Sequence, residues 1–355
     1  MQMALQLAAK AGGRTRPNPM VGAVVVRNGR VVGKGFHPRA GQPHAEIFAL
    51  RRAGNKTRGA TLYVSLEPCA HTGRTPACTE ALRAAGIRRV VAAMIDPDKR
   101  NQGRGLRWLK KHGMKTTVGV LKKEAAQLNK IFVTWKTKGR PFVTVKAAQS
   151  LDGKIATRTG SSRWISGPAA RRWVHQLRSR VDAILVGVET IVKDNPRLTC
   201  RNPFTRTQPI RVILDSQLRT PPSARVFSSR SPVVIATTSR APRDRERKLR
   251  HKGAEIVRLP TAGGRVSIPA LLKKLARREI SHLMIEGGGE TIASALAAGV
   301  VDRIALIVAP IVVGGREAQT AVEGVGIDSL SKSMKLKNFK VRPLGSDLLM
   351  TGDLI

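Results

Sequence analysis

Short runs of apolar, β-branched residues alternate with helix-like segments along almost the whole chain, and this alternation constrains the fold more than any other feature. Alternating strands and helices predict an α/β architecture, because each element must bury its apolar face against another layer. The pattern restarts where a helix-like segment ending near Trp135 meets Gly139 and Pro141, and a new β-branched run follows. We therefore predict two α/β domains, residues 1–140 and 141–355, in this chain of 355 residues.

The first region begins with a helix-like segment and a hairpin. The hairpin is expected over 20–36, because Asn28-Gly29 favours a two-residue turn between two β-branched runs. Further strands are expected within 61–69, 88–97 and 114–121, and helices within 3–12, 44–54, 77–86 and 105–113. This order predicts a three-layer domain with helices on both faces of one sheet.

The second region contains short apolar strands between helical stretches. These runs are 182–190, 210–216, 231–238 and 282–289. They are apolar without strict alternation, which indicates a mostly parallel sheet buried on both faces. No internal repeat, heptad seam or low-complexity tract interrupts the pattern.

The chain is strongly basic, with 64 Lys and Arg against 23 Asp and Glu and a formal net charge of +41. The excess is spread along the chain: residues 1–140 hold 28 basic and 6 acidic residues, and the rest hold 36 and 17. Aromatic residues, which stack on the bases of single strands, make up only 3%. We therefore predict no specific nucleic-acid partner. A solvated basic surface and attraction of small phosphorylated substrates remain as two alternative explanations of the charge.

The three cysteines, Cys69, Cys78 and Cys200, are too few for a disulfide scaffold and favour a reducing compartment. No apolar run reaches the roughly 20 residues of a membrane-spanning helix. The N-terminal segment lacks the apolar core and cleavage site of a signal peptide. We therefore expect a soluble cytoplasmic protein without a membrane partner.

His44, Cys69 and Cys78 have a spacing that indicates a zinc site. His44 is expected to open a helix, Cys69 to follow the end of a strand, and Cys78 to open the next helix. Two thiolates and one imidazole form an open three-ligand site that leaves a fourth position for water. Glu46 is not needed as a ligand and is free to carry protons. We predict one zinc ion per chain, with Glu46 as the catalytic residue of a deaminase.

Alternatives to this zinc deaminase remain open. Base and cytidine deaminases have Cys-x2-Cys where this chain has Cys-x8-Cys, so a disulfide or two unrelated buried thiols is one alternative. A tRNA or nucleobase deaminase with a basic RNA-binding C-terminal domain is the second enzyme hypothesis. The non-enzymatic hypothesis is a structural zinc protein or a basic nucleic-acid-binding protein. Glu46 argues against that hypothesis, because a structural zinc site needs no proton carrier.

The loop PCAHTGRTPAC, with HAE and NPMVGAVVV before it, resembles the bifunctional deaminase–reductase family of riboflavin biosynthesis. The resemblance continues in order through DPDKRNQGRG, KAAQSLDGKIA, SSRWISGPAAR, LVGVETIVKDNPRLTCR, IRVILDS and IEGGGETIASAL. It implies a cytidine-deaminase-like domain that deaminates a diaminopyrimidinone ribotide to the uracil form. It also implies a dihydrofolate-reductase-like α/β domain that reduces the ribosyl group to ribityl with NADPH. A homodimer or higher homo-oligomer is expected.

The same resemblance assigns residues in the deaminase domain. His44, Cys69 and Cys78 would hold zinc, and Glu46 would carry protons. The pyrimidine and phosphate pocket would be lined by Asn18, His37, His71, Arg74 and Asp96.

The reductase domain offers a weaker signal of its own, the glycines of IEGGG at a strand-to-helix turn. Such a turn lets backbone amides approach a phosphate, but the G-x-G-x-x-G spacing is missing and an ordinary tight turn is the alternative. The resemblance places Lys146 and Asp152 in the reductase active site. It assigns cofactor contacts to Ala148, Trp164, Thr190, Asp194, Ser216, Gly288, Gly289, Glu290, Thr291, Ile292, Ala293 and Ser294. It assigns substrate contacts to Ser162, Arg178, Leu198, Arg201 and Glu286.

Two residues depart from the family pattern. Asp98 replaces the Asn that usually follows Asp-Pro, and we expect it to affect polar recognition near Asp96. Glu189 replaces a small residue, and we expect its carboxylate to weaken binding of the NADPH phosphates.

Overall fold

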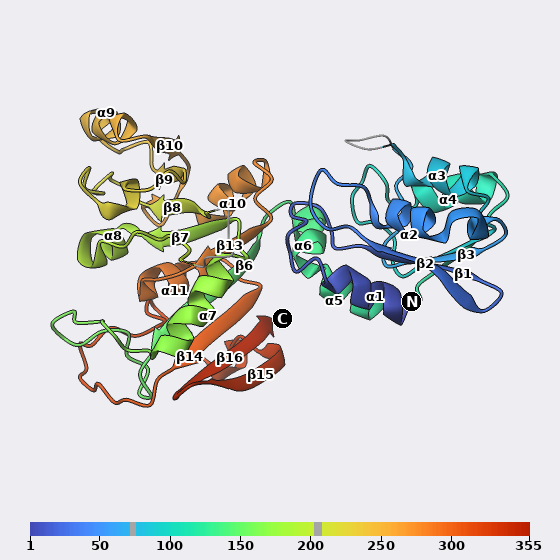
Figure 1. Ribbon diagram of the computed structural model, residues 1–355. Coiled ribbons are helices and arrows are strands. Elements are labelled where there is room, and N and C mark those ends of the chain that lie inside the picture. The colour runs from blue at the N-terminus through green and yellow to red at the C-terminus, as the bar shows by residue number, and fades with distance from the viewer. Residues whose placement is uncertain (72–75, 202–207) are drawn as a thin grey trace. The chain divides into compact units, whose positions relative to one another are not determined.

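The computed structural model describes residues 1–71, 76–201 and 208–355. The chain divides into two compact units, Met1–Arg140 (unit 1) and Pro141–Ile355 (unit 2), as Figure 1 shows. Each unit has its own sheet and its own apolar core.

Unit 1 contains a five-stranded sheet in the order β2-β1-β3-β4-β5, in which β1 pairs antiparallel with both neighbours and β3, β4 and β5 run parallel. The strands are β1 (Gly22–Arg27), β2 (Arg30–Phe36), β3 (Thr61–Val64), β4 (Arg89–Ala92) and β5 (Lys115–Val118). The helices are α1 (Gln2–Ala9), α2 (Ala45–Ala53), η1 (Gly54–Thr57), α3 (Cys78–Ala84), α4 (Arg104–Lys111), α5 (Lys122–Leu128) and α6 (Lys130–Lys138). In Figure 1, α2, α3 and α4 cover one face of the sheet, and α1, α5 and α6 lie on the other.

Glycines on β2 let α2 pack directly on the sheet. A Cβ atom at Gly35 would lie 2.3 Å from the carbonyl oxygen of Ala45, and one at Gly33 would lie 2.2 Å from that of Ala49. No side chain fits between this helix and this strand, so small residues are required on both sides. The contact fixes the start of α2, where the expected metal ligand and proton carrier lie.

Unit 2 contains a nine-stranded sheet in the order β10-β9-β8-β7-β13-β6-β14-β16-β15 and a separate pair, β11-β12. The strands are β6 (Phe142–Gln149), β7 (Ala183–Gly187), β8 (Ile210–Leu214), β9 (Val233–Thr237), β10 (Ala254–Arg258), β11 (Thr261–Ala262), β12 (Arg265–Val266), β13 (His282–Ile285), β14 (Arg303–Val308), β15 (Leu336–Leu344) and β16 (Asp347–Leu354). The helices are α7 (Pro168–Arg178), α8 (Val188–Asp194), η2 (Arg225–Phe227), α9 (Arg243–His251), α10 (Ile268–Ala276), α11 (Gly289–Ala297) and η3 (Leu330–Lys332).

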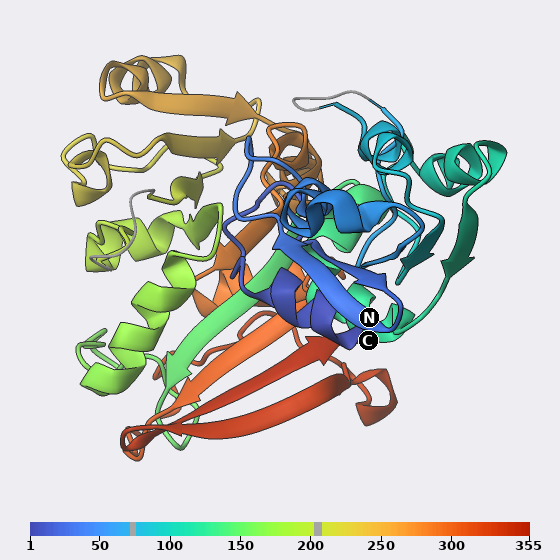
Figure 2. The ribbon, with the colours of Figure 1, turned by 45° about the vertical axis from the view of Figure 1, so that its right-hand side comes forward.

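The strands from β10 to β14 in this order are parallel, and β16 and β15 extend the sheet antiparallel at one edge. Figure 2 shows β6, β14, β16 and β15 side by side. Successive residues of the central strands enter different cores: Leu185 and Ile285 pack on one face, and Ile184 and Met284 on the other. Burial on both faces explains why these strands are apolar without alternation.

The predicted alternation of strands and helices is confirmed in both units, as are the three layers of unit 1. The apolar run 182–190 is only partly a strand, because α8 begins at Val188. The sequence did not reveal the antiparallel β15–β16 extension. Most of β15 is exposed, so it lacks the apolar run that marks a buried strand.

Candidate functional site

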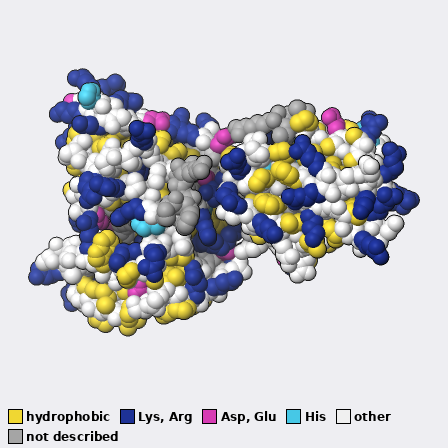
Figure 3. Space-filling view, in the orientation of Figure 1, with side chains coloured by type: hydrophobic (Ala, Val, Ile, Leu, Met, Phe, Trp, Pro, Cys, Tyr) yellow, Lys and Arg dark blue, Asp and Glu magenta, His cyan; other side chains and the backbone are white. Residues whose placement is uncertain are grey.

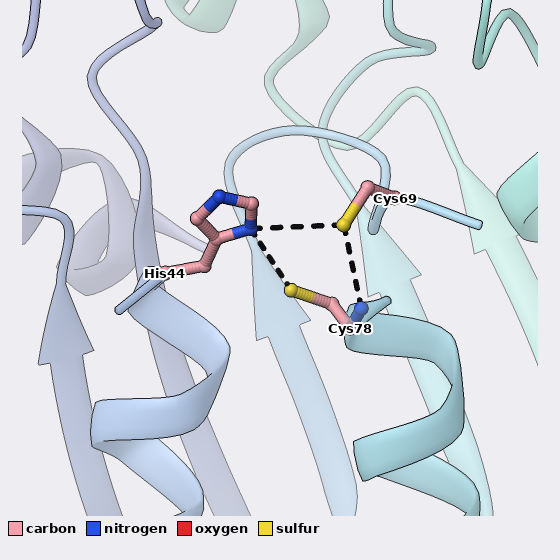
Figure 4. A group of neighbouring side chains, drawn as sticks. All are labelled: His44, Cys69 and Cys78. Carbon is pink, nitrogen blue, oxygen red and sulfur yellow. Dashed lines mark hydrogen bonds between the residues drawn. The ribbon is translucent and has the colours of Figure 1, made fainter. Parts of the chain in front are cut away.

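Three side chains that can bind a metal meet in unit 1 (Figure 4). His44 immediately precedes α2, Cys69 follows β3, and Cys78 is the first residue of α3. Because β2 and β3 both flank β1, the sheet brings these chain segments to one place. The residues predicted to be ligands therefore lie together.

The distances between the ligand atoms are those of a metal site. Nδ1 of His44 lies 3.1 Å from Sγ of Cys78 and 3.6 Å from Sγ of Cys69. With Zn–N near 2.0 Å and Zn–S near 2.3 Å, nitrogen and sulfur ligands of tetrahedral zinc lie roughly 3.6 Å apart. In the ranges that the structure describes, this is the only group of acidic, His and Cys side chains close enough to hold a metal ion. Its donor set, two sulfur atoms and one imidazole nitrogen, fits zinc.

The two thiols of this group differ in acidity. Hydrogen bonds from the Cys78 and His44 side chains lower the pKa of Cys69, although burial opposes the shift. The hydrogen bond to Cys69, together with burial, raises the pKa of Cys78. The backbone N–H of Cys78 also donates to Sγ of Cys69 at 3.3 Å. The arrangement favours a thiolate at Cys69, and a cation that binds both sulfur atoms would release the proton of Cys78.

Glu46 lies in the first turn of α2, next to the metal-binding group, and is only 3% exposed. Its Oε2 atom is buried without a hydrogen-bond partner among the described residues. Burial raises the pKa of this carboxyl group. A buried, unpaired carboxyl oxygen is costly, so it indicates a place where water or substrate binds during function. Three side chains that can bind a metal, beside such a carboxyl group, match the arrangement expected of an open hydrolytic zinc site.

Two of the residues predicted to bind the pyrimidine adjoin the metal group. Nδ1 of His37 donates to the carbonyl oxygen of Pro43 at 3.0 Å, which leaves Nε2 to accept from Nδ2 of Asn18 at 3.3 Å. The His37 ring packs edge-on against the His44 ring, with centroids 5.5 Å apart. Burial lowers the pKa of His37, so the neutral ring that this pairing requires is favoured.

The other predicted pocket residues of unit 1 lie in two loops. His71 has a buried Nδ1 atom that finds no hydrogen-bond partner in the described part of the chain. Asp96 accepts from the backbone N–H of Asp98 at 2.9 Å and from Nδ2 of Asn101 at 3.3 Å. Burial raises the pKa of Asp96 to about 6. Arg74, the predicted phosphate ligand, lies outside the described residues.

Glu67 has a positioning role that the motifs do not reveal. Its carboxylate accepts from the backbone N–H groups of Asp96, Gly103 and Leu106 at 3.0, 2.8 and 3.2 Å. It therefore ties the loop after β4 and the start of α4 to the segment that leads to Cys69. The available signal was a carboxylate at the end of an apolar strand, where a buried charge must find partners.

Asp98, the first departure from the family pattern, is paired with two cationic side chains, one in its own loop and one on α6. Its carboxylate lies 2.7 Å from Nη2 of Arg100 and 2.9 Å from Nζ of Lys136. Although burial opposes the effect, these contacts hold the pKa of Asp98 well below its usual value. Asp98 therefore fastens the loop to α6. Its charge still contributes to the raised pKa of Asp96, although burial contributes most.

In unit 2, an ion-pair cluster joins three predicted residues from three elements. Glu286, directly after β13, lies 2.7 Å from Nη2 of Arg178 on α7 and 3.8 Å from Nζ of Lys146 on β6. The three side chains are largely buried, at 6%, 14% and 14% exposure. Burial lowers the pKa of Lys146, although the charge of Glu286 opposes this shift. The cluster therefore places a lysine that gives up its proton readily beside a fixed carboxylate.

His175 extends this cluster, although no motif pointed to it. Its Nδ1 atom accepts from the backbone N–H of Arg201, a predicted substrate contact, at 3.1 Å. Burial, followed by the positive charges of Arg178 and Arg201, lowers the pKa of His175 to about 4. The ring is therefore neutral near pH 7. The signal in the sequence was the His-x-x-Arg spacing, which places both side chains on one face of a helix.

Two other predicted reductase residues make structural contacts. Asp152 accepts from the backbone N–H groups of Val313 and Gly314 at 3.0 and 2.7 Å. With a hydrogen bond from the Ser150 side chain, which contributes most, these hold the pKa of Asp152 below its usual value. Leu198 packs into an apolar core. These contacts fix a loop in the first case and fill the core in the second.

A cavity of about 750 Å³ lies at the carboxyl ends of β8, β7 and β13. These ends meet at one edge because the strands are parallel neighbours, and ligands of open α/β sheets bind at such edges. The predicted contacts among its lining residues are Ser162, Thr190, Asp194, Ser216, Gly288, Gly289, Glu290, Thr291 and Ser294. The cavity also lies at the start of α11, where backbone N–H groups favour a phosphate. Its volume is that of a small-molecule or cofactor site.

The remaining predicted cofactor residues lie away from the lining of this cavity. Trp164 is 67% exposed, with the Arg171 guanidinium 4.7 Å from its ring centroid. Ile292 is buried in the core below α11, and Ala293 follows it on that helix. Ala148 packs with a small apolar cluster beside α7.

Two of the acidic residues that line the cavity are paired with arginines. Glu189, the second departure from the family pattern, forms an ion pair with Arg219. Glu290 lies 2.8 Å from Nη1 of Arg265. All four residues line the cavity. The expected repulsion between Glu189 and a bound phosphate is therefore offset by a neighbouring positive charge.

The surface matches the basic composition. Figure 3 shows Lys and Arg side chains scattered over the visible face of each unit, with few acidic side chains between them. Within the described ranges, no helix is both long and apolar enough to cross a membrane.

Known families match both units. Residues 1–94 match the family described as the cytidine and deoxycytidylate deaminase zinc-binding region, and residues 141–350 match the RibD C-terminal domain. The riboflavin biosynthesis protein RibD of Aquifex aeolicus is 45% identical over 99% of this chain and 96% of its own length. The RibD protein of Escherichia coli is 38% identical, over 99% of this chain and 97% of its own.

Solved structures show the same two-unit chain. Acinetobacter baumannii RibD matches 100% of this chain and 97% of its own, with a TM-score of 0.88 and 34% identity. A Thermotoga maritima protein, described as a diaminohydroxyphosphoribosylaminopyrimidine deaminase/5-amino-6-(5-phosphoribosylamino)uracil reductase, covers the same shares with a TM-score of 0.84 and 36% identity.

These matches confirm the predicted fold class, with a cytidine-deaminase-like unit followed by a reductase unit. They also disfavour the RNA-deaminase hypothesis, because unit 2 matches a reductase rather than an RNA-binding domain. The chain belongs to the RibD family and is a bifunctional deaminase and reductase of riboflavin biosynthesis.

Proposed function

We propose that unit 1 deaminates a diaminohydroxyphosphoribosylaminopyrimidine, and that unit 2 reduces the ribosyl group of the resulting 5-amino-6-(5-phosphoribosylamino)uracil with NADPH. These are the substrates in the description of the Thermotoga maritima relative. The observation that carries the proposal is one chain with two different sites. One is the His44–Cys69–Cys78 group beside Glu46, and the other is the cavity at the sheet edge of unit 2.

In unit 1, His44, Cys69 and Cys78 would hold zinc, which supplies a Lewis acid for hydrolysis when bound. Glu46 takes a proton from the attacking water and delivers it to the leaving amine, so that water is consumed and ammonia is released. Its buried position suits both steps, because the raised pKa lets the carboxyl group hold a proton between them. Asn18, whose side-chain nitrogen faces His37, presents its amide to the pyrimidine.

The remaining residues of this pocket orient the ribotide. His71 and Asp96 offer polar atoms to the pyrimidine, and Arg74 binds the phosphate. Glu67 acts indirectly, because it holds the loop that carries Asp96.

In unit 2, NADPH supplies the hydride when bound. Lys146 donates a proton to the ribosyl oxygen, which its lowered pKa favours. Glu286 orients Lys146, and Arg178 with Arg201 binds the anionic part of the substrate. Asp152 and Ser162 also contact the substrate. The cavity, which Ser162 lines, takes the dinucleotide.

The direct test is to incubate the purified chain with the diaminopyrimidine ribotide, with and without NADPH, and to identify the products by mass. We expect the uracil form without NADPH and the ribityl form with it. Conversion of a free nucleobase or a tRNA base, with no conversion of the ribotide, would contradict the proposal.

We also propose that the chain forms a homodimer or higher homo-oligomer. Apolar side chains are exposed along the segment from Val312 to Val341, and include Val325, Leu330 and Phe339. The edge strand β15 is exposed over most of its length, and unprotected edges pair readily with another chain. Light scattering coupled to size-exclusion chromatography tests the oligomeric state. A monomer at micromolar concentration would contradict the proposal. A Phe339→Lys variant should shift the equilibrium towards the monomer.

We propose a cytoplasmic enzyme without a specific nucleic-acid partner. The described cysteines are free thiols, which suits a reducing compartment. The basic side chains are spread over the face of each unit that Figure 3 shows. RNA binding should therefore be weak, independent of sequence and steeply dependent on salt. Binding to RNA that survives physiological salt and discriminates between sequences would overturn this part of the proposal.

A further inference from the structure

Two arginines line the cavity of unit 2 without an assigned role. Arg219 follows β8, and Arg265 lies on β12. Their side chains are 45% and 65% exposed and reach the cavity from two different segments. Each is paired with one carboxylate that also lines the cavity, Glu189 or Glu290.

The sheet order shows which end of the cavity these arginines occupy. Lys146 lies on β6, and β8 is separated from β6 by β7 and β13. Three strand spacings of about 4.8 Å put β8 roughly 14 Å from the strand that carries Lys146. Because the hydride must be delivered near Lys146, the nicotinamide lies at that side of the sheet. The arginines therefore lie at the adenosine end of an extended dinucleotide.

The residues that line the cavity are consistent with this orientation of the dinucleotide. Between the two ends lies the glycine turn at the start of α11, which favours the pyrophosphate. On the side of the arginines, the lining includes the apolar residues Leu214, Val266, Ile268 and Pro269. Such residues form a surface against which a flat base can pack.

The turn that carries Arg219 is fixed by the buried Asp215. Oδ1 of Asp215 accepts from the backbone N–H of Arg219 at 2.9 Å, and Oδ2 accepts from the N–H and hydroxyl of Thr220, both at 2.7 Å. Oγ of Ser216 accepts from the N–H of Val266, the neighbour of Arg265, at 3.2 Å. The two arginines are thus held on segments that are hydrogen-bonded to each other.

We propose that Arg219 and Arg265 bind the phosphate on the 2′-oxygen of the adenosine ribose and so select NADPH over NADH. Planar guanidinium groups bind phosphate oxygens in pairs, and an arginine near the ribose is the usual means of accepting this phosphate. Glu189 and Glu290 hold the two side chains at the cavity before the phosphate replaces them as partner. The inference rests on the proposed use of NADPH by unit 2.

The experiment measures dissociation constants of the full-length chain for NADPH, NADH and the fragments 2′,5′-ADP and 5′-AMP by calorimetry. Arg219→Gln and Arg265→Gln should each weaken NADPH and 2′,5′-ADP by at least about tenfold, because each removes charged hydrogen bonds. Binding of NADH and 5′-AMP should change by less than about twofold. Arg277→Gln, on an exposed arginine outside the cavity lining, is the matched control and should change neither.

Glu189→Gln should have the opposite effect on NADPH affinity. It removes a carboxylate that competes for Arg219, so NADPH should bind about two- to fivefold more tightly, as expected for an exposed ion pair. Arg219→Lys should bind NADPH with intermediate affinity, because it keeps the charge and loses the paired geometry. Thermal melting of every variant separates lost contacts from lost folding.

The outcomes distinguish this inference from the proposed function. If the unaltered chain binds NADPH and NADH equally, or if the arginine variants weaken both equally, the inference is wrong while reduction by a nicotinamide cofactor stands. If the unaltered chain binds neither dinucleotide, both are wrong. Selective loss of NADPH and 2′,5′-ADP supports the inference.

Discussion

The candidate functional groups are close together in unit 1 and widely spread in unit 2. In unit 1, the side-chain atoms of His44, Cys69 and Cys78 that can bind a metal lie within 4.8 Å of one another. In unit 2, the candidate residues follow or lie on four neighbouring strands, from β8 to β6, and only some of them line the cavity of about 750 Å³. A metal needs a few donors at fixed short distances, whereas a dinucleotide needs many weak contacts over a long surface. The first requirement leaves a specific spacing in the sequence, and the second does not.

The two units also differ in whether their buried carboxyl groups have partners. Glu46 in unit 1 has an unpaired buried oxygen, whereas Glu286 in unit 2 is paired with Arg178 and faces Lys146. A group that carries protons must be able to change its charge, and a group that positions a cation must keep its charge. The comparison is therefore consistent with the proposed roles, in which Glu46 carries protons and Glu286 positions Lys146.

The largest expected effect comes from metal removal, which should affect only unit 1. Chelation should lower ammonia release by more than about 10⁴-fold, because the Lewis acid for hydrolysis is lost. Reduction of the deaminated ribotide should be unchanged. Metal analysis with both assays checks this, and added zinc should restore deamination. Cys200→Ser, which alters a thiol outside the metal group, should keep the full zinc content.

Glu46→Gln should separate the activities without removing the metal. Deamination should fall by about 10²–10⁴-fold, because the amide cannot carry a proton. Zinc content and oxidation of NADPH with the deaminated ribotide should match the unaltered chain. Loss of both activities in a folded variant would show that the two sites are not independent.

Arg178→Ala is the corresponding substitution in unit 2 and should affect only the reductase. It removes a charged partner of Glu286 and a cation at the substrate end, so the Michaelis constant of the reductase should rise by about 10–100-fold. Deamination should be unchanged. Steady-state kinetics of both reactions give the measurement, and an equal loss in both would count against separate sites.

The smallest effect concerns the acid stability of unit 2. His175 has a pKa of about 4 in the folded chain, against 6.5 when unfolded, so the unfolded state binds more protons between these values. The free energy of unfolding should therefore fall as the pH drops from about 6.5 towards 4, by about 1 kcal/mol after allowance for solvent screening. Calorimetry at pH 7 and pH 5 should show a shift of about 2–4 °C in the unfolding temperature of unit 2. His175→Asn should reduce this shift, and an unchanged pH dependence would rule out this histidine as its source.

Much of unit 1 could be predicted from the sequence. The Asn28-Gly29 turn, the apolar strands and the Cys and His spacing each carry a local physical meaning. Together they predicted the sheet and a group of side chains that lie close enough to hold a metal ion. Glu67 was missed because its three partners are backbone N–H groups more than 28 residues away, which no side-chain pattern records.

The site of unit 2 was harder to predict from the sequence, for a related reason. Its parallel strands were evident from their apolar runs, but its site is assembled from segments distant in the chain. His175, Arg219 and Arg265 each resemble ordinary polar positions of a helix, a loop and a short strand. The parallel register of β8, β7 and β13, which brings the strand ends at the cavity to one edge, is not visible in the local sequence. The glycine turn before α11 is the single local signal, and alone it could be any tight turn.

The close packing of β2 on α2 has a consequence for how this enzyme can change over evolutionary time. A Cβ atom at Gly35 would collide with the carbonyl oxygen of Ala45, the residue between His44 and Glu46. Any larger residue there would push the helix away, at an overpacking cost of about 1–3 kcal/mol. His44 and Glu46, the proposed ligand and proton carrier, would move with it. A strand position without functional atoms is thus under the same selection as the active site. Lineages that keep deamination should keep this glycine, whereas lineages that have lost deamination are free to replace it.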